Sequence, residues 1–286
     1  MLYGICLQGG YFMIQNSVLL AASLTLFAGL ATTLGGAIAF YTKRANTNFL
    51  AIALGFSAGV MIYVSMLEIM SKAKNLLIEA IGDKAGNWAA VLAFFGGILL
   101  ISVIDKFIPS VEENPGMPLT IPHAEEKPSS GDSPYNRKLL RMGLFTALAI
   151  GIHNFPEGLI TFFSTLQNPV MGLSIAAAIA IHNIPEGIAV AGPIYYATGS
   201  RRQAFLWAFF SGIAEPVGAL AGYLVLAPFL SSALYGIIFA VVAGIMVYIS
   251  FDHLLPAARE YGGHHLSALG MISGMVLMAL SLLLFL

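Results

Sequence analysis

Residues 153–158 read H-N-F-P-E-G, and the nearly identical hexapeptide H-N-I-P-E-G recurs 29 residues later, at 182–187. Residues four apart lie on the same face of an α-helix, so each copy places its histidine beside its glutamate. The proline between them has no N–H and frees a backbone carbonyl, which is tolerated inside a membrane only where protein or water satisfies it. The repeated hexapeptide therefore predicts the wall of a polar cavity.

The composition is that of an integral membrane protein. Of 286 residues, 58% are hydrophobic and 9% are charged, against about a quarter charged in soluble domains. The net charge of −1 comes without a basic stripe that could neutralise phosphates, which excludes a nucleic-acid partner. Cys6 is the one cysteine, so neither an internal disulfide nor a thiolate metal site can form.

Mostly apolar runs, each about the 20 residues that span hydrocarbon, predict an all-α integral membrane protein with eight transmembrane helices. They lie at 17–42, 48–71, 87–107, 142–165, 170–196, 203–227, 233–256 and 265–286. The long polar connection at 108–141 is rich in proline and glutamate and predicts a flexible loop between helices three and four. The whole chain, 1–286, is expected to form a single transmembrane domain.

Lysine and arginine are distributed unevenly between the two sides of this arrangement. One side holds Lys43, Arg44, Lys106, Lys127, Arg137, Lys138, Arg141, Arg201, Arg202 and Arg259. The other side holds Lys72, Lys74 and Lys84. By the positive-inside rule the first side is cytoplasmic, so loop 108–141 faces the cytoplasm and both termini are extracytoplasmic.

An internal repeat indicates how the helices are arranged. Residues 58–65, A-G-V-M-I-Y-V-S, recur as A-G-I-M-V-Y-I-S at 243–250, in a predicted helix of opposite direction. The two H-N-x-P-E-G helices are also antiparallel, and G-L-A at 29–31 has a weaker counterpart in G-I-A at 212–214. The pattern favours a 3+2+3 arrangement of inverted repeats, with a site near the middle of the membrane.

Three glutamates, Glu157, Glu186 and Glu215, lie deep within predicted helices, whereas no lysine or arginine does. A carboxylate at the bilayer centre costs about 2.5 to 3.5 kcal/mol, so these three either hold protons or share a cation. Two histidines beside two of them favour a metal, since neutral imidazole is the commonest ligand of divalent zinc and iron. Without thiolates, the set favours zinc, iron or manganese over copper(I).

Two other functions would use these residues differently. A proton channel, or a proton-coupled carrier without metal, would use the three glutamates but gives no reason for two histidines at the same spacing. An intramembrane metalloprotease needs a zinc ion with an open position for water, and its usual H-E-x-x-H motif is absent.

The doubled hexapeptide, the eight spans and the long loop after the third span resemble the ZIP (Zrt/Irt-like protein) family of divalent metal transporters, and within it the bacterial ZupT type. The resemblance covers nearly the whole chain. It implies transport of zinc, and also of iron, manganese or cadmium, across the cell membrane into the cytoplasm. The metal is then a substrate, so neither a prosthetic group nor enzyme activity is expected. A homodimer in the lipid bilayer is also implied.

The resemblance further implies a binuclear metal site on the fourth, fifth and sixth helices. One metal would be held by His153, Glu157, His182 and Glu186. The second would be held by Asn154, Asn183 and Glu215, with Glu157 and Glu186 bridging the two ions. Many eukaryotic members have H-E-x-P-H-E-x-G-D in the fifth helix, so H-N-I-P-E-G leaves the metal preference open.

Further candidate ligands follow the two repeated octapeptides. Glu68, and Asp252 with His253, are expected at the entrance and the exit of the cation route. The resemblance implies that helices one, four, five and six move as a unit against the other four. That movement would expose the central site to each side of the membrane in turn.

Overall fold

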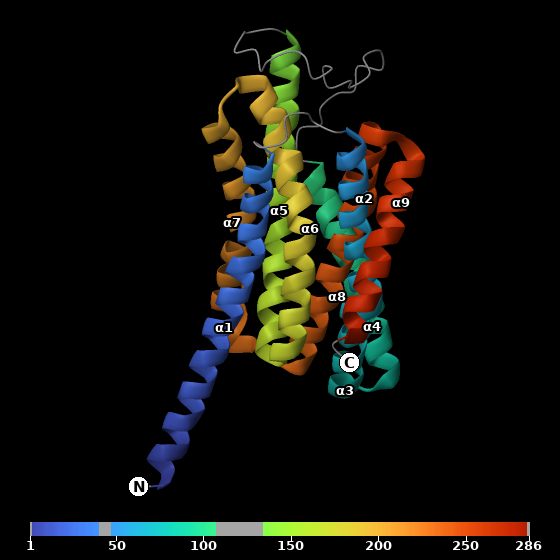
Figure 1. Ribbon diagram of the computed structural model, residues 1–286. Helices are drawn as coiled ribbons and strands as arrows, with labels where there is room; N and C mark the ends of the chain where they lie inside the picture. Colours follow the sequence, from blue (N-terminus) through green and yellow to red (C-terminus); the bar gives the residue numbers. More distant parts are fainter. Residues whose placement is uncertain (1, 40–46, 107–133, 285–286) are drawn as a thin grey trace.

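The computed structural model describes residues 2–39, 47–106 and 134–284, and within them the fold is all-helical, as predicted (Figure 1). The elements in order are α1 (Leu2–Ile38), α2 (Thr47–Tyr63), η1 (Val64–Ile69), α3 (Met70–Ile81), α4 (Asp83–Asp105), α5 (Pro134–Gln167), α6 (Pro169–Thr198), α7 (Arg201–Leu226), η2 (Ala227–Phe229), α8 (Ser232–Ile249), η3 (Ser250–Leu254) and α9 (Leu255–Leu284). The segments η1 and η3 are π-helical and η2 is a short 3₁₀-helix.

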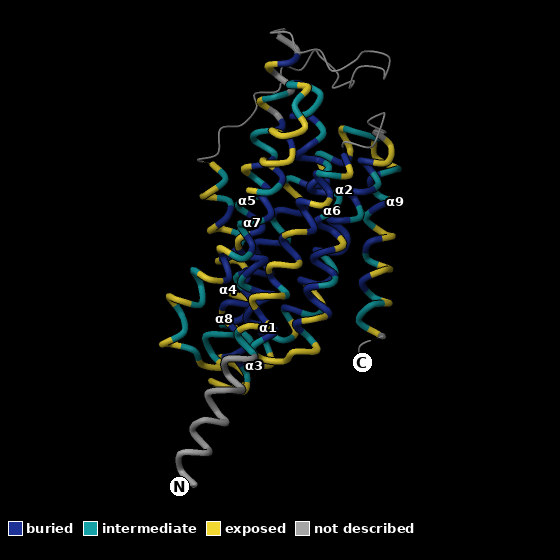
Figure 2. Tube along the Cα trace, turned by 60° about the vertical axis from the view of Figure 1, so that its left-hand side comes forward, coloured by how far each residue is buried: buried dark blue, intermediate teal, exposed yellow. Residues whose placement is uncertain are grey.

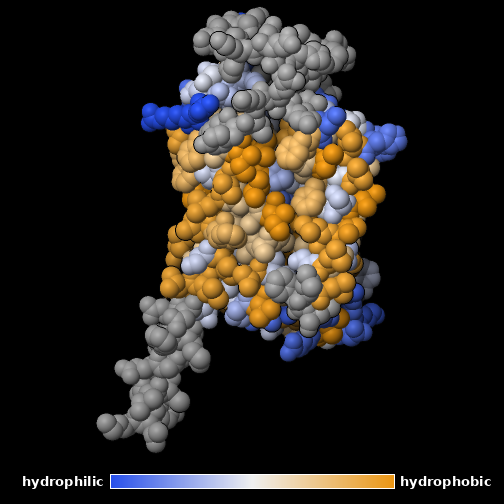
Figure 3. Space-filling view, in the orientation of Figure 1, coloured by the Kyte–Doolittle hydropathy of each residue, from blue (hydrophilic) through white to orange (hydrophobic). Residues whose placement is uncertain are grey.

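Six helical runs in the described part of the chain are long and apolar enough to cross a membrane: Ser17–Ile38, Asn48–Ile81, Asp83–Asp105, Pro169–Thr198, Arg201–Phe229 and Ser232–Leu283. A multi-pass membrane protein is therefore confirmed, and Figure 3 shows the matching apolar belt between two hydrophilic ends. The count of eight spans is not established. Helix α5 is not among the six because polar residues interrupt it, and α8, η3 and α9 form one run of 52 residues.

Several helix boundaries differ from those expected. Helix α5 begins at Pro134, so residues 134–141 of the predicted flexible loop are helical, while 107–133 lie outside the described residues. The second span was expected to end at residue 71, but the helix continues through α3 to Ile81. The reason is that α3 is amphipathic: Ala73, Leu76 and Leu77 are buried although the segment carries polar residues.

The helices form two groups. The first, called the four-helix bundle below, consists of α1, α5, α6 and α7, each packed against the other three. The second bundle consists of α2, α3, α4, α8 and α9, in which α2 pairs with α9 and α4 pairs with α8 (Figure 1). The main contacts between the two bundles are those of α2 with α6 and of α5 with α8.

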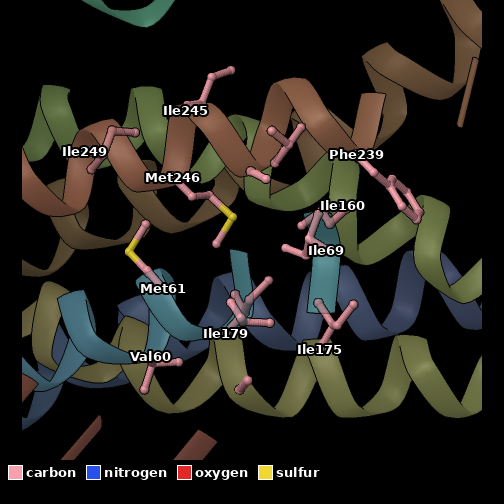
Figure 4. Close-up of a cluster of buried hydrophobic side chains, with 14 of the residues drawn as sticks. Val60, Met61, Ile69, Ile160, Ile175, Ile179, Phe239, Ile245, Met246 and Ile249 are labelled. Carbon is pink, nitrogen blue, oxygen red and sulfur yellow. The ribbon is translucent and has the colours of Figure 1, made fainter. Parts of the chain in front are cut away.

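An apolar cluster lies where the two bundles meet. Ile160 of α5 and Ile179 of α6 belong to it together with Met61 of α2 and Met246 of α8. The two methionines occupy equivalent positions in the octapeptide repeat, and Figure 4 shows the side chains of both projecting into the space between the two helices. Figure 2 shows that buried segments occupy the middle of the assembly, whereas exposed residues lie on its outer faces.

The octapeptide repeat extends into the local backbone. Its first copy, 58–65, leads into the π-helix η1, and its second, 243–250, leads into the π-helix η3. A π-helical turn inserts an extra residue into the helix and frequently marks a functional site. Glu68 lies in η1, and Asp252 and His253 lie in η3.

The connection between α5 and α6 consists of Asn168 alone. Its side-chain oxygen accepts hydrogen bonds from the backbone N–H groups of Val170, at 2.9 Å, and Met171, at 3.3 Å. Pro169 at the first helical position needs no hydrogen-bond acceptor for its nitrogen. This cap folds the two motif-bearing helices into a tight antiparallel hairpin.

Candidate metal centre

The repeated hexapeptides meet inside the four-helix bundle. Pro156 and Pro185 lie within continuous helices α5 and α6, as the sequence predicts. All seven residues of the expected central site are at most 2% exposed: His153, Asn154, Glu157, His182, Asn183, Glu186 and Glu215. The structure therefore gathers these side chains from α5, α6 and α7 in the interior of one bundle.

The histidines and glutamates contact each other crosswise between the two helices. Nε2 of His153 lies 3.2 Å from Oε2 of Glu186, and Nε2 of His182 lies 3.3 Å from Oε1 of Glu157. The two contacts are equivalent when α5 and α6 are exchanged. Shared helix faces were expected within each hexapeptide, but packing pairs each imidazole with the carboxylate of the other copy.

The two asparagines have fixed orientations because each amide nitrogen donates to a backbone carbonyl. Nδ2 of Asn154 donates to the carbonyl of Ser211 on α7, and Nδ2 of Asn183 donates to that of Ala28 on α1, both at 3.0 Å. Asn183 also donates to a carboxylate oxygen of Glu215. Because a backbone carbonyl can only accept, the atom of each asparagine side chain that contacts it must be the amide nitrogen. The amide oxygen of each asparagine is therefore left to face a ligand.

Five buried oxygens of this centre have no hydrogen-bond donor. They are Oδ1 of Asn154, Oδ1 of Asn183, Oε2 of Glu157, Oε1 of Glu186 and Oε2 of Glu215. An unsatisfied buried polar group costs about 1 to 3 kcal/mol, and more when it is charged. Among the residues whose burial is described, no lysine or arginine is buried. This set of oxygen ligands fits a divalent cation, which would satisfy several of the oxygens at once.

The glycine that ends each hexapeptide permits close packing behind the site. A Cβ on Gly158 would overlap the backbone carbonyl oxygen of Glu215, and a Cβ on Gly187 would overlap that of Thr32. Helices α7 and α1 therefore approach α5 and α6 as closely as backbones allow.

A second cluster of titratable side chains lies at the C-terminal end of α4. Nε2 of His253 is 3.1 Å from a carboxylate oxygen of Asp105 and 3.8 Å from one of Asp252. Among the described residues, this is the one group of three His, Asp or Glu ligand atoms that all lie within 4.8 Å of one another. At the central site such atoms meet in pairs.

The second cluster contains two of the three predicted entrance and exit ligands. Asp252 and His253 are both in it, but Glu68 is half-buried in η1 and belongs to neither cluster. Asp105 was missed by the sequence reasoning. The available signal was its position as the last acid of the third predicted span, directly before Lys106 and hence on the same side as η3.

Comparison with known proteins agrees with these findings. The family model described as ZIP Zinc transporter matches residues 118–282. The chain is 59% identical over 262 residues to the zinc transporter ZupT of Streptococcus mutans, covering 92% of this chain and 96% of that protein. It is 58% identical over 274 residues to the ZupT of Oceanobacillus iheyensis, covering 94% and 99%. The chain therefore belongs to the ZIP family of transporters.

Proposed function

We propose that this protein transports divalent transition-metal cations, zinc foremost and also iron, manganese and cadmium, into the cytoplasm through the centre inside the four-helix bundle. The observation that carries the proposal is the set of five buried oxygens without a donor. The relatives support the substrate, because they are named as zinc transporters. They support transport rather than an enzymatic reaction for the same reason.

The centre holds two ions in this proposal. His153 and His182, with Glu157 and Glu186, bind the first, which takes the place of the direct contact within each imidazole–carboxylate pair. The amide oxygens of Asn154 and Asn183 and the carboxylate of Glu215 bind the second, bridged to the first by the two other glutamates. Imidazole favours zinc at the first position, whereas the second offers oxygen ligands.

Eight crossings, with both termini outside, are the topology that accompanies this function. The run Ser232–Leu283 has 52 residues and would extend about 78 Å as one helix, against a hydrocarbon core of about 30 Å. Gly263, with φ of 77°, interrupts α9 near its start and supports a turn between two crossings. With α5 as a further span, the 3+2+3 arrangement follows. In the cell membrane, the positive-inside rule supports an orientation with residues 108–141 on the cytoplasmic side.

Movement of the four-helix bundle against the second bundle opens the centre to each side in turn. All seven ligands belong to the first bundle, so they move together without losing their mutual contacts. The apolar cluster around Met61 and Met246 provides a contact surface without directional hydrogen bonds (Figure 4). Asp105, Asp252 and His253, in the second bundle and on the cytoplasmic side, accept the ion as it leaves. The homodimer that the family resemblance implies stays a prediction.

The test is uptake by purified protein in liposomes loaded with a fluorescent zinc indicator. Saturable zinc entry is expected, reduced by iron, manganese and cadmium added outside, with no entry into protein-free liposomes. The matched control for the site is Glu79→Gln, a change to an exposed glutamate on α3, against the same change at Glu157. Equal uptake by both variants, or none by the wild type, would contradict the proposal.

A further inference from the structure

Helices α1 and α7 cross at two equivalent glycines. A Cβ on Gly29 would overlap the carbonyl oxygen of Gly212, and a Cβ on Gly212 would overlap that of Gly29. Such a mutual contact is what a two-fold axis through the crossing requires. Under this two-fold axis, each residue of α1 is equivalent to the residue of α7 that lies 183 positions later, as Gly29 is to Gly212. The hexapeptides make residues of α5 and α6 that are 29 positions apart equivalent.

Contacts elsewhere in the four-helix bundle obey both relations. Asn183 donates to the carbonyl of Ala28, and the equivalent Asn154 donates to that of the equivalent Ser211. The glycine contacts form matching pairs in the same way. In the first pair, Gly187 packs against the carbonyl of Thr32, and the equivalent Gly158 packs against the carbonyl of Glu215. In the second pair, Gly35 packs against the carbonyl of Ile184, and the equivalent Gly218 packs against the carbonyl of Phe155.

The residue equivalent to Glu215 is Thr32. Its side chain is 0% exposed, and its hydroxyl has no hydrogen-bond partner. Helix α1 packs against α5 as α7 packs against α6, so the equivalence relates the pair Thr32 and Asn154 to the contacting pair Glu215 and Asn183. Oδ1 of Asn154, like the hydroxyl of Thr32, is buried and has no hydrogen-bond partner. Two buried oxygens without a partner, at positions related to the contact of Glu215 with Asn183, each require an explanation.

We infer that Thr32 is an eighth residue of the metal centre, supplying a neutral oxygen to the second cation from the side opposite Glu215. This inference rests on the proposed function and deepens it. A hydroxyl at this position provides an oxygen ligand without adding a fourth buried carboxylate, whose charge would be costly whenever the centre is empty. The pair of Thr32 and Glu215 makes an otherwise symmetric centre asymmetric in charge.

The test is zinc titration of detergent-solubilised protein by calorimetry, giving both affinity and stoichiometry. Thr32→Val, which removes the hydroxyl at constant shape, is expected to weaken the second zinc about tenfold. The matched control is Thr25→Val on the same helix, where the hydroxyl already donates to the carbonyl of Ala21 at 2.8 Å. Wild-type affinity is expected there, and equal affinities of the two variants would overturn the inference.

Circular dichroism and gel filtration show whether Thr32→Val folds. If it does not fold, exchanging the two equivalent residues tests whether position 32 lies at the second cation. Glu215→Thr is expected to lose the second zinc. Adding Thr32→Glu moves the carboxylate to the equivalent position and is expected to restore two zinc ions per chain. A folded double variant that binds one zinc, as Glu215→Thr does, would overturn the inference. A wild type that binds none would instead overturn the proposed function.

Discussion

The central site and the cluster at the end of α4 use the same kinds of side chain in opposite environments. His153, Glu157 and their partners are at most 2% exposed, whereas Asp105, His253 and Asp252 are 24%, 29% and 51% exposed. Water screens the charges of the exposed cluster and satisfies its free oxygens, so it gains little from an ion. The buried oxygens have no such compensation. Burial is therefore the property that separates the proposed transport site from the proposed exit site.

Removing one buried charge should have the largest effect. Glu157→Gln is expected to reduce zinc affinity at least about 100-fold, because the residue is proposed to bridge both ions. Glu215→Gln is expected to remove the second zinc and leave the first bound to both histidines. Calorimetric titration of the two variants checks the difference. Equal impairment by both would contradict two unequal ions sharing bridging glutamates.

A change behind the central site should be nearly as damaging although it removes no ligand atom. Gly158→Ala places a Cβ on the carbonyl of Glu215 and separates α5 from α7, which is expected to destabilise the fold by about 1 to 3 kcal/mol. Zinc affinity should fall with it. The control is Gly192→Ala on α6, where a Cβ meets nothing within 4 Å. If both variants melt at the wild-type temperature, the close packing does not hold the site together.

The histidines should set the choice of metal more than the strength of binding. His153→Ala and His182→Ala are each expected to weaken zinc about tenfold more than iron(II), since imidazole is the softer donor and the carboxylates remain for the harder ion. Competition between the two metals in uptake measures the ratio. An equal loss of affinity for zinc and for iron(II) would show that the histidines do not favour zinc over iron(II).

The exposed cluster should show the smallest effect, and on rate rather than affinity. Asp105→Asn is expected to slow zinc uptake by a factor of about two to five, the scale of an exposed charge pair. Zinc affinity at the central site should stay unchanged, as measured by calorimetry. A loss of affinity as large as that of Glu157→Gln would remove the distinction between the two regions.

Much of the fold and of the central site could be predicted because each rests on short-range patterns. The apolar runs locate most helices, and the doubled hexapeptide locates six of the seven central residues. Three features could not be predicted in this way. The crosswise pairing of His153 with Glu186 depends on how α5 and α6 pack. Asp105 meets His253 only through the contact of α4 with the chain after α8. The proposed role of Thr32 follows only from its equivalence to Glu215.

Asn168 has a consequence for how this chain can change in length. With one residue between α5 and α6, the connection has no slack to absorb an insertion or a deletion. One residue added within either helix, between its hexapeptide and this turn, would rotate that hexapeptide by about 100° and shift it by about 1.5 Å relative to the other. The imidazole of each copy would then face away from the carboxylate of the other. Related chains should therefore vary freely in the number of residues between α4 and α5 but keep the number between the two hexapeptides constant.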